Sequence, residues 1–386
     1  MILNNLTKKT QRNLLDYILL IIIFIYCLQM PIISRYIILL GIPIIIFTNP
    51  NLLLKKLTNT FLLLGFLSSY YLIIFWHGIF SYSPLYLIIN IFSPIILYLC
   101  GLNLSNGKIK PLNVLIISTM GFIIFANLSV IFSFLKYSTL FFRDADNFWT
   151  GIPANSPYWG IFLSLGIAYL NVIFLKIKKI NKILLITIST LSIISILTLA
   201  TRSPIYAGVL SITTCLIIYL KKEKEKKSIK SLITGIVLFL FIFIVITNFF
   251  SFGDYLFGVE RISETGLDDT GRTEHWFPAL KGIFKYPLGG QKTILNNSYA
   301  HNFWLDIGWY AGIIPIIFIL IFQFKHIKII YKNIIENKVR YLEIGIFIAI
   351  LVSYMIEPLF QASPVYFSLT IFLIGYYGNT TLNKNK

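Results

Sequence analysis

Charged residues are scarce in this sequence of 386 residues. Asp, Glu, Lys and Arg make up only 12% of it, whereas hydrophobic residues make up 57% and the mean hydropathy is +0.79. Soluble domains carry roughly 25% charged residues. Polar stretches never exceed about fifty residues, so no sizeable soluble domain fits between the apolar runs. The composition therefore excludes a soluble enzyme and predicts a polytopic membrane protein.

Cysteine and histidine are also rare. The three cysteines each lie within an apolar run; they are Cys27, Cys100 and Cys215. This placement predicts neither a disulfide framework nor a metal cluster. One acid-rich group has the spacing of neither an H-E-x-x-H site nor a calcium loop; it consists of Asp268, Asp269, Glu274 and His275. We therefore expect no metal and no cofactor.

Apolar runs of about the length that crosses 30 Å of hydrocarbon recur from one end of the chain to the other. Twelve such runs lie near residues 14–34, 36–49, 59–80, 85–104, 112–135, 157–175, 183–200, 203–220, 231–250, 302–324, 341–358 and 361–379. The sequence thus predicts an all-α polytopic integral membrane protein with about twelve transmembrane helices. We expect residues 1–386 to form a single membrane domain.

The net charge of +18 is distributed unevenly between the two predicted sides of the membrane. With the N-terminus inside, the inward segments hold 24 of the 33 Lys and Arg residues, and only five of the 15 acids lie in them or at the inner ends of the spans. This bias follows the positive-inside rule and predicts that both termini are cytoplasmic. The basic character suits an anionic inner leaflet, so it does not indicate a nucleic-acid partner.

Two predicted outward segments are longer than a tight turn, residues 136–156 and residues 251–301. The longer one includes a stretch from Trp276 to Tyr286 that is both apolar and basic. Its apolar residues recur at helical spacing and its lysines fall on another face; they are Trp276, Leu280, Ile283 and Phe284, and Lys281 and Lys285. This pattern predicts a helix that lies in the membrane interface.

Few ionisable residues lie near the predicted midplane, whereas three polar residues gather on the predicted outer side. They are Arg202 between two spans, Arg272 in the long loop, and His301 at the start of the tenth span. Arginine keeps its charge and offers a planar fork of donors that matches phosphate oxygens, so two arginines indicate a diphosphate. His301 would move a proton near neutral pH or hydrogen-bond a hydroxyl or phosphate.

Other polar residues lie beside His301 or at another outer end. Asn302 and Asp306 are four residues apart and share one helix face. Gly308 and Gly312 form a G-x-x-x-G pattern, which we interpret as helix packing. Glu357, which precedes Pro358, would be catalytic or merely part of a bend.

Three segments resemble motifs of the O-antigen polymerase and O-antigen ligase superfamily of bacterial surface-polysaccharide enzymes. They are Leu197-Thr198-Leu199-Ala200-Thr201-Arg202-Ser203-Pro204, then Gly271-Arg272-Thr273-Glu274-His275-Trp276 through Pro287-Leu288-Gly289-Gly290, and Ala300-His301-Asn302-Phe303 followed by Gly308 and Gly312. The family usually has a glycine after its Ser-Arg element, where this sequence has Ser203-Pro204.

The resemblance implies a metal-independent, inverting glycosyltransferase of the bacterial inner membrane. The donor would be an oligosaccharide on undecaprenyl diphosphate, bound at the outer face by Arg202 and Arg272. An acceptor hydroxyl would attack the anomeric carbon, while His301 orients or deprotonates it or contacts the diphosphate. The substrate would also be bound by Asn302, Arg261, Arg143 and Asp306. Membrane lipid, chain-length regulators and flippase proteins would be partners.

Three functions are compatible with these motifs. A polymerase would join lipid-linked repeat units, and we favour it because polymerases are the more diverse in sequence. A ligase would transfer the glycan to the lipid A core. A flippase for lipid-linked oligosaccharides would need charge deep in its cavity, and the sequence places little there.

Overall fold

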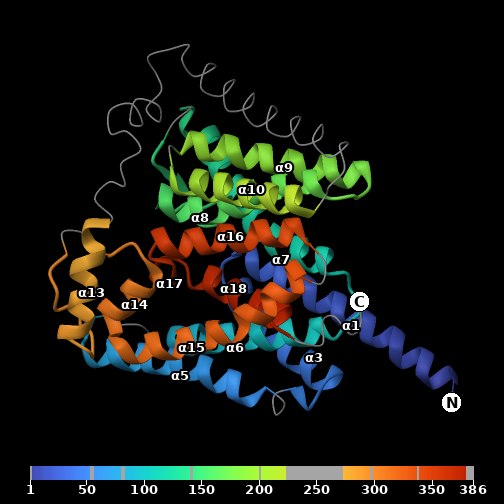
Figure 1. The fold of residues 1–386 in the computed structure, drawn as a ribbon, viewed down its shortest axis with the longest axis horizontal. Coiled ribbons are helices and arrows are strands. Elements are labelled where there is room, and N and C mark those ends of the chain that lie inside the picture. Colours follow the sequence, from blue (N-terminus) through green and yellow to red (C-terminus); the bar gives the residue numbers. More distant parts are fainter. Residues whose placement is uncertain are drawn as a thin grey trace. The chain divides into compact units, whose positions relative to one another are not determined.

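The computed structural model describes residues 2–52, 56–79, 83–139, 142–199, 201–222, 273–295, 299–336 and 339–379. The chain is mostly helical in these ranges (Figure 1). The predicted span 231–250, and the loop from 251 to Arg272, lie outside them. The chain divides into two compact units, one within residues 1–122, 271–339 and 354–386, the other within 123–270 and 340–353.

The first unit holds most of the helices. They are α1 (Ile2–Cys27), α2 (Ile33–Ile37), the 3-10 turn η1 (Ile38–Leu40), α3 (Gly41–Thr48), α5 (Leu57–Trp76), α6 (Pro84–Ser105), the start of α7 (Pro111–Tyr137), the 3-10 turn η3 (Thr273–His275), α13 (Trp276–Lys285), α14 (Phe303–Ala311), α15 (Ile313–Tyr331), the π turn η4 (Lys332–Glu336), the end of α16 (Tyr341–Ile356), α17 (Leu359–Ala362) and α18 (Pro364–Tyr377). α6 packs along α18, and α5 packs along α15.

The second unit is built around α8 (Ser156–Ala168), which packs against α9 (Lys179–Thr198) and α10 (Ser203–Lys222). It also holds the rest of α7, the 3-10 turn η2 (Tyr169–Phe174) and most of α16. Its strands β1 (Asp144–Asp146) and β2 (Pro153–Asn155) form an antiparallel pair in which Ala145 lies opposite Ala154.

Serines and one asparagine tie α9 to its neighbours in this unit. The Asn127 side chain of α7 donates to Ser192 Oγ (3.1 Å) and accepts from Ser195 Oγ (2.8 Å). Ser189 Oγ donates to the carbonyl of Gly166 in α8 (2.7 Å). Where lipid surrounds a bundle, hydrophobic burial does not hold helices together, so such hydrogen bonds and close contacts do.

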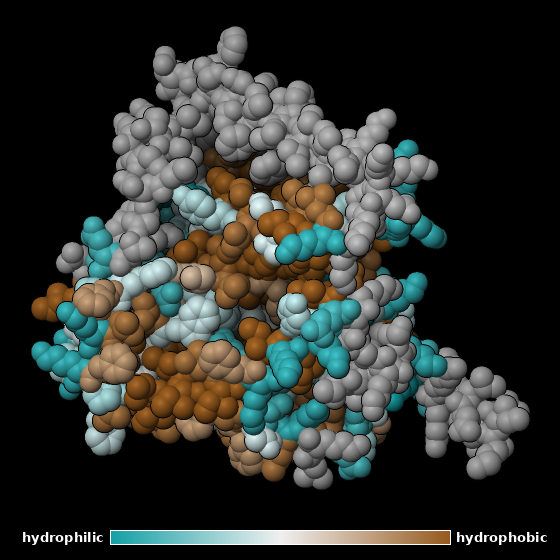
Figure 2. Space-filling view, viewed as in Figure 1, coloured by the Kyte–Doolittle hydropathy of each residue, from teal (hydrophilic) through white to brown (hydrophobic). Residues whose placement is uncertain are grey.

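Seven described helices are long and apolar enough to cross a membrane. They are Leu57–Trp76, Leu85–Ser105, Pro111–Tyr137, Ser156–Phe174, Lys179–Thr198, Ser203–Lys221 and Ile313–Glu336. Shorter apolar helices cover Ile33–Thr48, Tyr341–Ile356 and Pro364–Tyr377. Figure 2 shows hydrophobic side chains gathered over α5 and α15, where water would make their exposure costly and lipid would not. The helices agree with an all-α membrane protein, and the count of twelve spans stays a prediction.

The predicted span 302–324 is wrong at its start. α14 ends at Ala311, Gly312 adopts a φ of 76°, and the candidate span begins at Ile313 and continues to Glu336. The left-handed conformation of Gly312 interrupts the helix, and a Cβ there would collide with the carbonyl of Pro287. Gly308 has the predicted packing role, since Ile283 of α13 lies against it. The apolar run therefore contains a short helix followed by a span.

The tightest helix pair of the first unit depends on two glycines. A Cβ on Gly101 of α6 would collide with the carbonyl of Phe372 in α18, and a Cβ on Gly375 would collide with the carbonyl of Tyr98. The backbones of α6 and α18 can approach this closely only because these positions carry no side chain.

We expect Gly101→Ala to destabilise the protein by about 1–3 kcal/mol, because the added methyl group meets backbone that cannot turn away. Thermal unfolding of the purified protein in detergent measures the effect. Gly65→Ala is the matched control, since its methyl group would meet only the Phe318 ring, which can rotate. Equal melting temperatures for the two variants would contradict the role of Gly101.

Candidate functional site

The predicted site residues fall into three groups. His301, Asn302 and Asp306 lie together in the first unit, at the start of α14. Arg202 and Arg143 belong to the second unit. Arg272 and Arg261 lie outside the described residues. The structure therefore brings together the third motif, and the meeting of His301 with the arginines stays a prediction.

The backbone at His301 is held in an unusual conformation by Asp306. His301 has a φ of 54°, a left-handed value that non-glycine residues seldom adopt. One carboxylate oxygen of Asp306 accepts the N–H of Ala300 (2.7 Å) and the other accepts the N–H of Asn302 (3.0 Å). Asp306 thus binds the amide on each side of His301, and its side chain is fully buried. The half-buried His301 side chain therefore projects from a fixed turn.

Asn302 completes this turn as the N-cap of α14. Its side-chain oxygen accepts the N–H of Leu305 (3.2 Å), which caps the helix, and its amide donates to the carbonyl of Met355 (3.2 Å). The prediction that Asn302 and Asp306 share one helix face is wrong, because Asn302 precedes the helix with an extended backbone, and its contact with Asp306 is made by its backbone N–H. Both side chains bind the chain's own backbone, and their contact with substrate stays a prediction.

Aromatic rings fix the same segment against the rest of the first unit. The buried Phe303 stacks on Tyr354 with ring centroids 4.3 Å apart, and on Phe367 of α18 at 5.7 Å. Tyr299 stands edge-on to the imidazole of His301 at 6.2 Å. The burial of Phe303 between these rings anchors the start of α14. His301, which directly precedes this helix, is therefore held in a rigid setting.

Glu357, for which the sequence left open a catalytic role or a bend, lies close enough to Asp306 to affect it. It follows α16 and is only 2% exposed, and an inverse γ-turn at Pro358 connects it to α17. The predicted bend is therefore confirmed. Its charge also acts on Asp306, so two buried carboxyl groups lie near the His301 turn. Only the Glu-Pro pair at the end of an apolar run signals this residue in the sequence.

The buried position of Asp306 changes its acidity. Burial raises the pKa of Asp306 to about 7; the hydrogen bonds from Ala300 and Asn302 lower it, and the nearby Glu357 raises it. The carboxyl group therefore exchanges its proton close to neutral pH. The turn that carries His301 is held by a group whose charge changes in the physiological range.

Arg202 lies in the second unit, at the junction of α9 and α10. Its carbonyl accepts the N–H groups of Ile205 (2.9 Å) and Tyr206 (3.3 Å), and its side chain is half-buried. Pro204 occupies the first turn of α10, where a missing N–H costs nothing. The Ser-Pro pair that replaces the family's glycine thus starts a regular helix.

Arg143 is exposed and directly precedes the β1–β2 hairpin, within the shorter of the two segments predicted to face outward. The indole N–H of Trp159 donates to the carbonyls of Ala145 (3.1 Å) and Ala154 (3.0 Å), which binds both strands. Asp146 accepts hydrogen bonds from Lys136 and Tyr137. Burial alone would raise the pKa of Asp146, but these hydrogen bonds lower it below its usual value. Arg143 therefore projects from a rigid loop.

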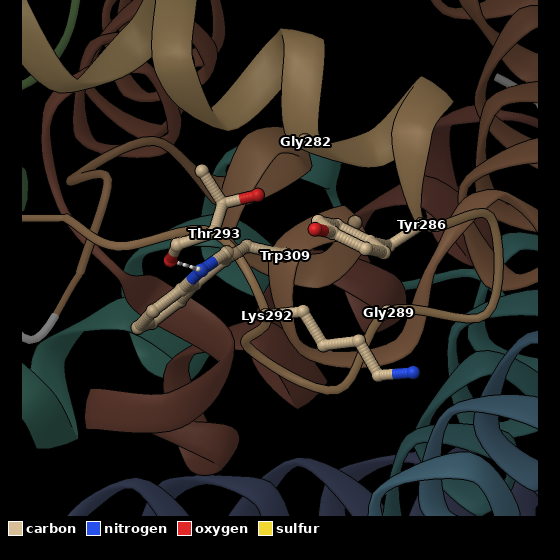
Figure 3. A pocket seen from close by; sticks show the side chains of 7 residues that line it. Gly282, Tyr286, Gly289, Lys292, Thr293 and Trp309 are labelled. Carbon is tan, nitrogen blue, oxygen red and sulfur yellow. Dashed lines mark hydrogen bonds between the residues drawn. The ribbon is translucent and has the colours of Figure 1, made fainter.

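The second motif ends in a glycine turn beside a shallow pocket (Figure 3). Gly290 donates to the carbonyl of Tyr310 (2.9 Å), and the Trp309 indole donates to the carbonyl of Thr293 (2.9 Å). The pocket is lined by Gly282, Tyr286, Gly289, Lys292, Thr293, Gly308 and Trp309. Its space of about 140 Å³ is open to solvent, so it is a surface depression rather than a chamber for a small molecule.

No cluster of His, Cys, Asp or Glu suited to a metal ion occurs in the part of the chain that the structure describes. The chemistry that remains at the His301 turn is that of an imidazole and two buried carboxyl groups. Such groups hold, orient and transfer protons.

We expect Asp306→Asn to lower the free energy of unfolding by about 1–3 kcal/mol. The amide has one acceptor oxygen, so either Ala300 or Asn302 would lose its partner and face an N–H group instead. Thermal unfolding in detergent measures the loss. Asp144→Asn, which changes an exposed acid, is the control, and an equal small effect of both variants would refute the role given to Asp306.

The stability that depends on Asp306 should decrease as pH rises. Its pKa of about 7 in the folded chain exceeds the ordinary value of 3.8, so the folded chain keeps a proton that the unfolded chain has lost between these values. The melting temperature of the wild type minus that of Asp306→Asn should therefore be larger at pH 5 than at pH 8. A difference that grows with pH would show the opposite shift.

Comparison of the chain with protein-family models, curated proteins and solved structures gives no match. The resemblance to the O-antigen polymerase and ligase superfamily therefore rests on the three sequence motifs.

Proposed function

We propose that the protein is a glycosyltransferase that polymerises surface polysaccharide from repeat units linked to undecaprenyl diphosphate, at the outer face of a bacterial inner membrane. The observation that carries this proposal is the His301 turn. Asp306 binds the amides on both sides of the turn, Asn302 caps the helix that follows it, and His301 itself stays half-buried rather than enclosed in the core. A purely structural histidine needs no such support.

The contrast with His326 strengthens this reading. His326 is buried in α15, its Nδ1 lies 2.7 Å from the carbonyl of Phe322, and its Nε2 lies 3.0 Å from the hydroxyl of Tyr98. The ring of His326 is thus enclosed within the protein core, as in a histidine that serves packing. His301 is the one histidine of the three motifs with a ring open in part to a substrate.

In the proposed reaction, an acceptor sugar hydroxyl attacks the anomeric carbon of the donor. The new C–O bond forms as the bond from that carbon to the diphosphate oxygen breaks, and the diphosphate leaves with the electron pair. His301 accepts the hydroxyl proton or orients the hydroxyl. Attack opposite the leaving group inverts the anomeric carbon.

Arginines would stabilise the departing diphosphate. Charge develops on the phosphate oxygens as the bond breaks, and a guanidinium offsets it without proton transfer. Arg202 and Arg272 have this role in the proposal, and Arg143 and Arg261 would bind more distant parts of the donor. A diphosphate needs little protonation to leave, so neither a metal ion nor a carboxylic acid is required.

We expect His301→Ala, Arg202→Ala and Arg272→Ala each to abolish or sharply reduce long surface glycan, with normal protein levels in the membrane. Arg272→Lys should also impair, because the fork of donors is lost. A glycan gel from a strain that lacks the protein and carries each variant measures this. Arg35→Ala, an exposed arginine of α2, is the matched control and should leave the glycan unchanged.

The same gel separates the three functions. Lipid A core capped by a single repeat unit identifies a polymerase, because ligation continues. Bare core with long glycan on the lipid carrier identifies a ligase. Bare core without long glycan on the carrier identifies a flippase, because the units then never reach the outer side. An unaltered ladder in all three alanine variants would contradict the site.

A further inference from the structure

The side chains of helix α13 form three edges that run along the helix and differ in burial and polarity. The first edge is buried and consists of Ala279, Gly282 and Ile283. At 3.6 residues per turn, the exposed remainder splits into an apolar edge and a basic edge. The apolar edge carries Phe277, Leu280 and Phe284, and the basic edge carries Lys281 and Lys285. The sequence pattern groups Ile283 with Leu280 and Phe284 on one apolar face, whereas the structure separates them, because Ile283 is buried against Gly308 of α14.

The apolar edge of α13 is strongly exposed. Phe284 is 70% exposed, Phe277 is 63% exposed and Leu280 is 43% exposed, and Leu288 and Ile294 beyond the helix are also exposed. Figure 2 shows hydrophobic and hydrophilic side chains side by side over α13. Two such phenylalanines in water would forgo several kcal/mol of burial, on the order of 2 kcal/mol each. A covering apolar phase is therefore expected.

The charged residues within α13 and in the segment that follows it are all basic. The sequence has no Asp or Glu between Glu274 and Asp306, whereas it has three lysines there, Lys281, Lys285 and Lys292. Lys281 lies over the Phe277 ring at 4.4 Å, and Lys285 and Lys292 lie beside the Tyr286 ring at 5.4 and 5.8 Å. A basic cluster on a predicted outer segment runs against the positive-inside bias, so it indicates an anionic partner.

The direction of α13 agrees with a position in the plane of the membrane. Figure 1 shows α13 turned across the direction of α5 and α15, which are candidate spans of the same unit. Contacts fix α13 at the ends of α5 and α15. The Nε2 atom of His77, which follows α5, lies 3.0 Å from the carbonyl oxygen of Leu288, and α14 packs against both α13 and α15. A helix across the end of two spans lies at the level of the lipid headgroups.

We propose that the exposed face of α13, together with Leu288 and Lys292, docks in the headgroup layer of the bilayer and binds anionic phospholipid. The phenylalanines and Leu280 enter the upper acyl region, and the three lysines contact lipid phosphates, each from beside an aromatic ring. The bilayer is the occupant because the apolar and basic edges run side by side along one helix. A lipid surface likewise has an apolar acyl region directly beside a layer of anionic headgroups.

The position of α13 can be measured with an environment-sensitive fluorophore on Phe284→Cys. The native cysteines Cys27, Cys100 and Cys215 are buried, and unmodified protein serves as the blank. In vesicles of phosphatidylcholine with phosphatidylglycerol, lipids brominated near the headgroup should quench this probe strongly and iodide in the water weakly. Lys110→Cys should show the reverse, and Leu72→Cys should respond to deeper bromines.

Lipid preference is tested with the same probe. Headgroup spin-labelled phosphatidylglycerol should quench it more than spin-labelled phosphatidylcholine at equal content. Replacement of Lys281, Lys285 and Lys292 by glutamine should remove this difference. The matched control is glutamine at three exposed lysines elsewhere, Lys176, Lys178 and Lys179, which should preserve it.

Three results would overturn the proposal. Iodide quenching of the Phe284 probe equal to that of Lys110→Cys would place α13 in water. Protection from both quenchers would mean that protein covers it, for example a second copy of the chain. Equal quenching by the two spin-labelled lipids would remove the anionic preference. None of these measurements depends on the proposed reaction, so the surface and the activity can fail separately.

Discussion

The Asp306 carboxylate is the interaction on which the candidate site depends. A left-handed φ at His301 costs of order 1–3 kcal/mol, and a turn under such strain would relax without support. The two hydrogen bonds to the Asp306 carboxyl group contribute about 0.5–1.5 kcal/mol each, which together offset a cost of this size. The N-cap of Asn302 adds to this. The strained backbone conformation and the hydrogen bonds that stabilise it are thus both at His301, the residue that carries the imidazole.

The break at Gly312 gives this carboxylate a place outside a membrane span. A buried acid in the middle of a span is costly in lipid. Because Gly312 ends α14 and lets α15 begin separately, Asp306 lies in a short helix before the span. The glycine turn after α13 is bound to the same point, since Ile313 donates to the carbonyl of Pro287 (2.9 Å). Backbone N–H and C=O groups of this non-helical region are thus hydrogen-bonded to one another, as the low polarity of a membrane boundary requires.

Hydropathy predicted where the helices lie better than it predicted where they break and which side chains face protein or lipid. Six predicted spans agree with described helices to within a few residues, and α13 occupies the stretch predicted for an interfacial helix. The break at Gly312 was missed because an apolar run reads the same with or without a left-handed glycine. The side of Ile283 was missed because periodicity does not tell whether an apolar residue faces protein or lipid.

Chemical roles were harder to predict than helices, because they depend on contacts between distant segments. The spacing of Asn302 and Asp306 predicted a shared helix face, whereas Asp306 binds the backbone on both sides of His301 and Asn302 caps α14 and binds the carbonyl of Met355. No sequence pattern predicts these backbone contacts. Glu357 is 51 residues from Asp306 along the chain, so only the fold brings its charge near. Arg202 and Arg143 occupy rigid local settings that the sequence did not suggest, a helix start and the foot of a hairpin.

The lipid surface and the candidate site are mechanically connected. Ile283 on the buried edge of α13 packs against Gly308, and Gly308 lies on the same short helix that begins at the His301 turn. If α13 is fixed at the headgroup level, α14 and His301 are fixed in height with it. In a sugar linked to a lipid diphosphate, the anomeric carbon is bonded to the outer phosphate and so lies just above the headgroup level. The helix that binds lipid phosphates would therefore set the height of the imidazole at the plane where the substrate's bond must break.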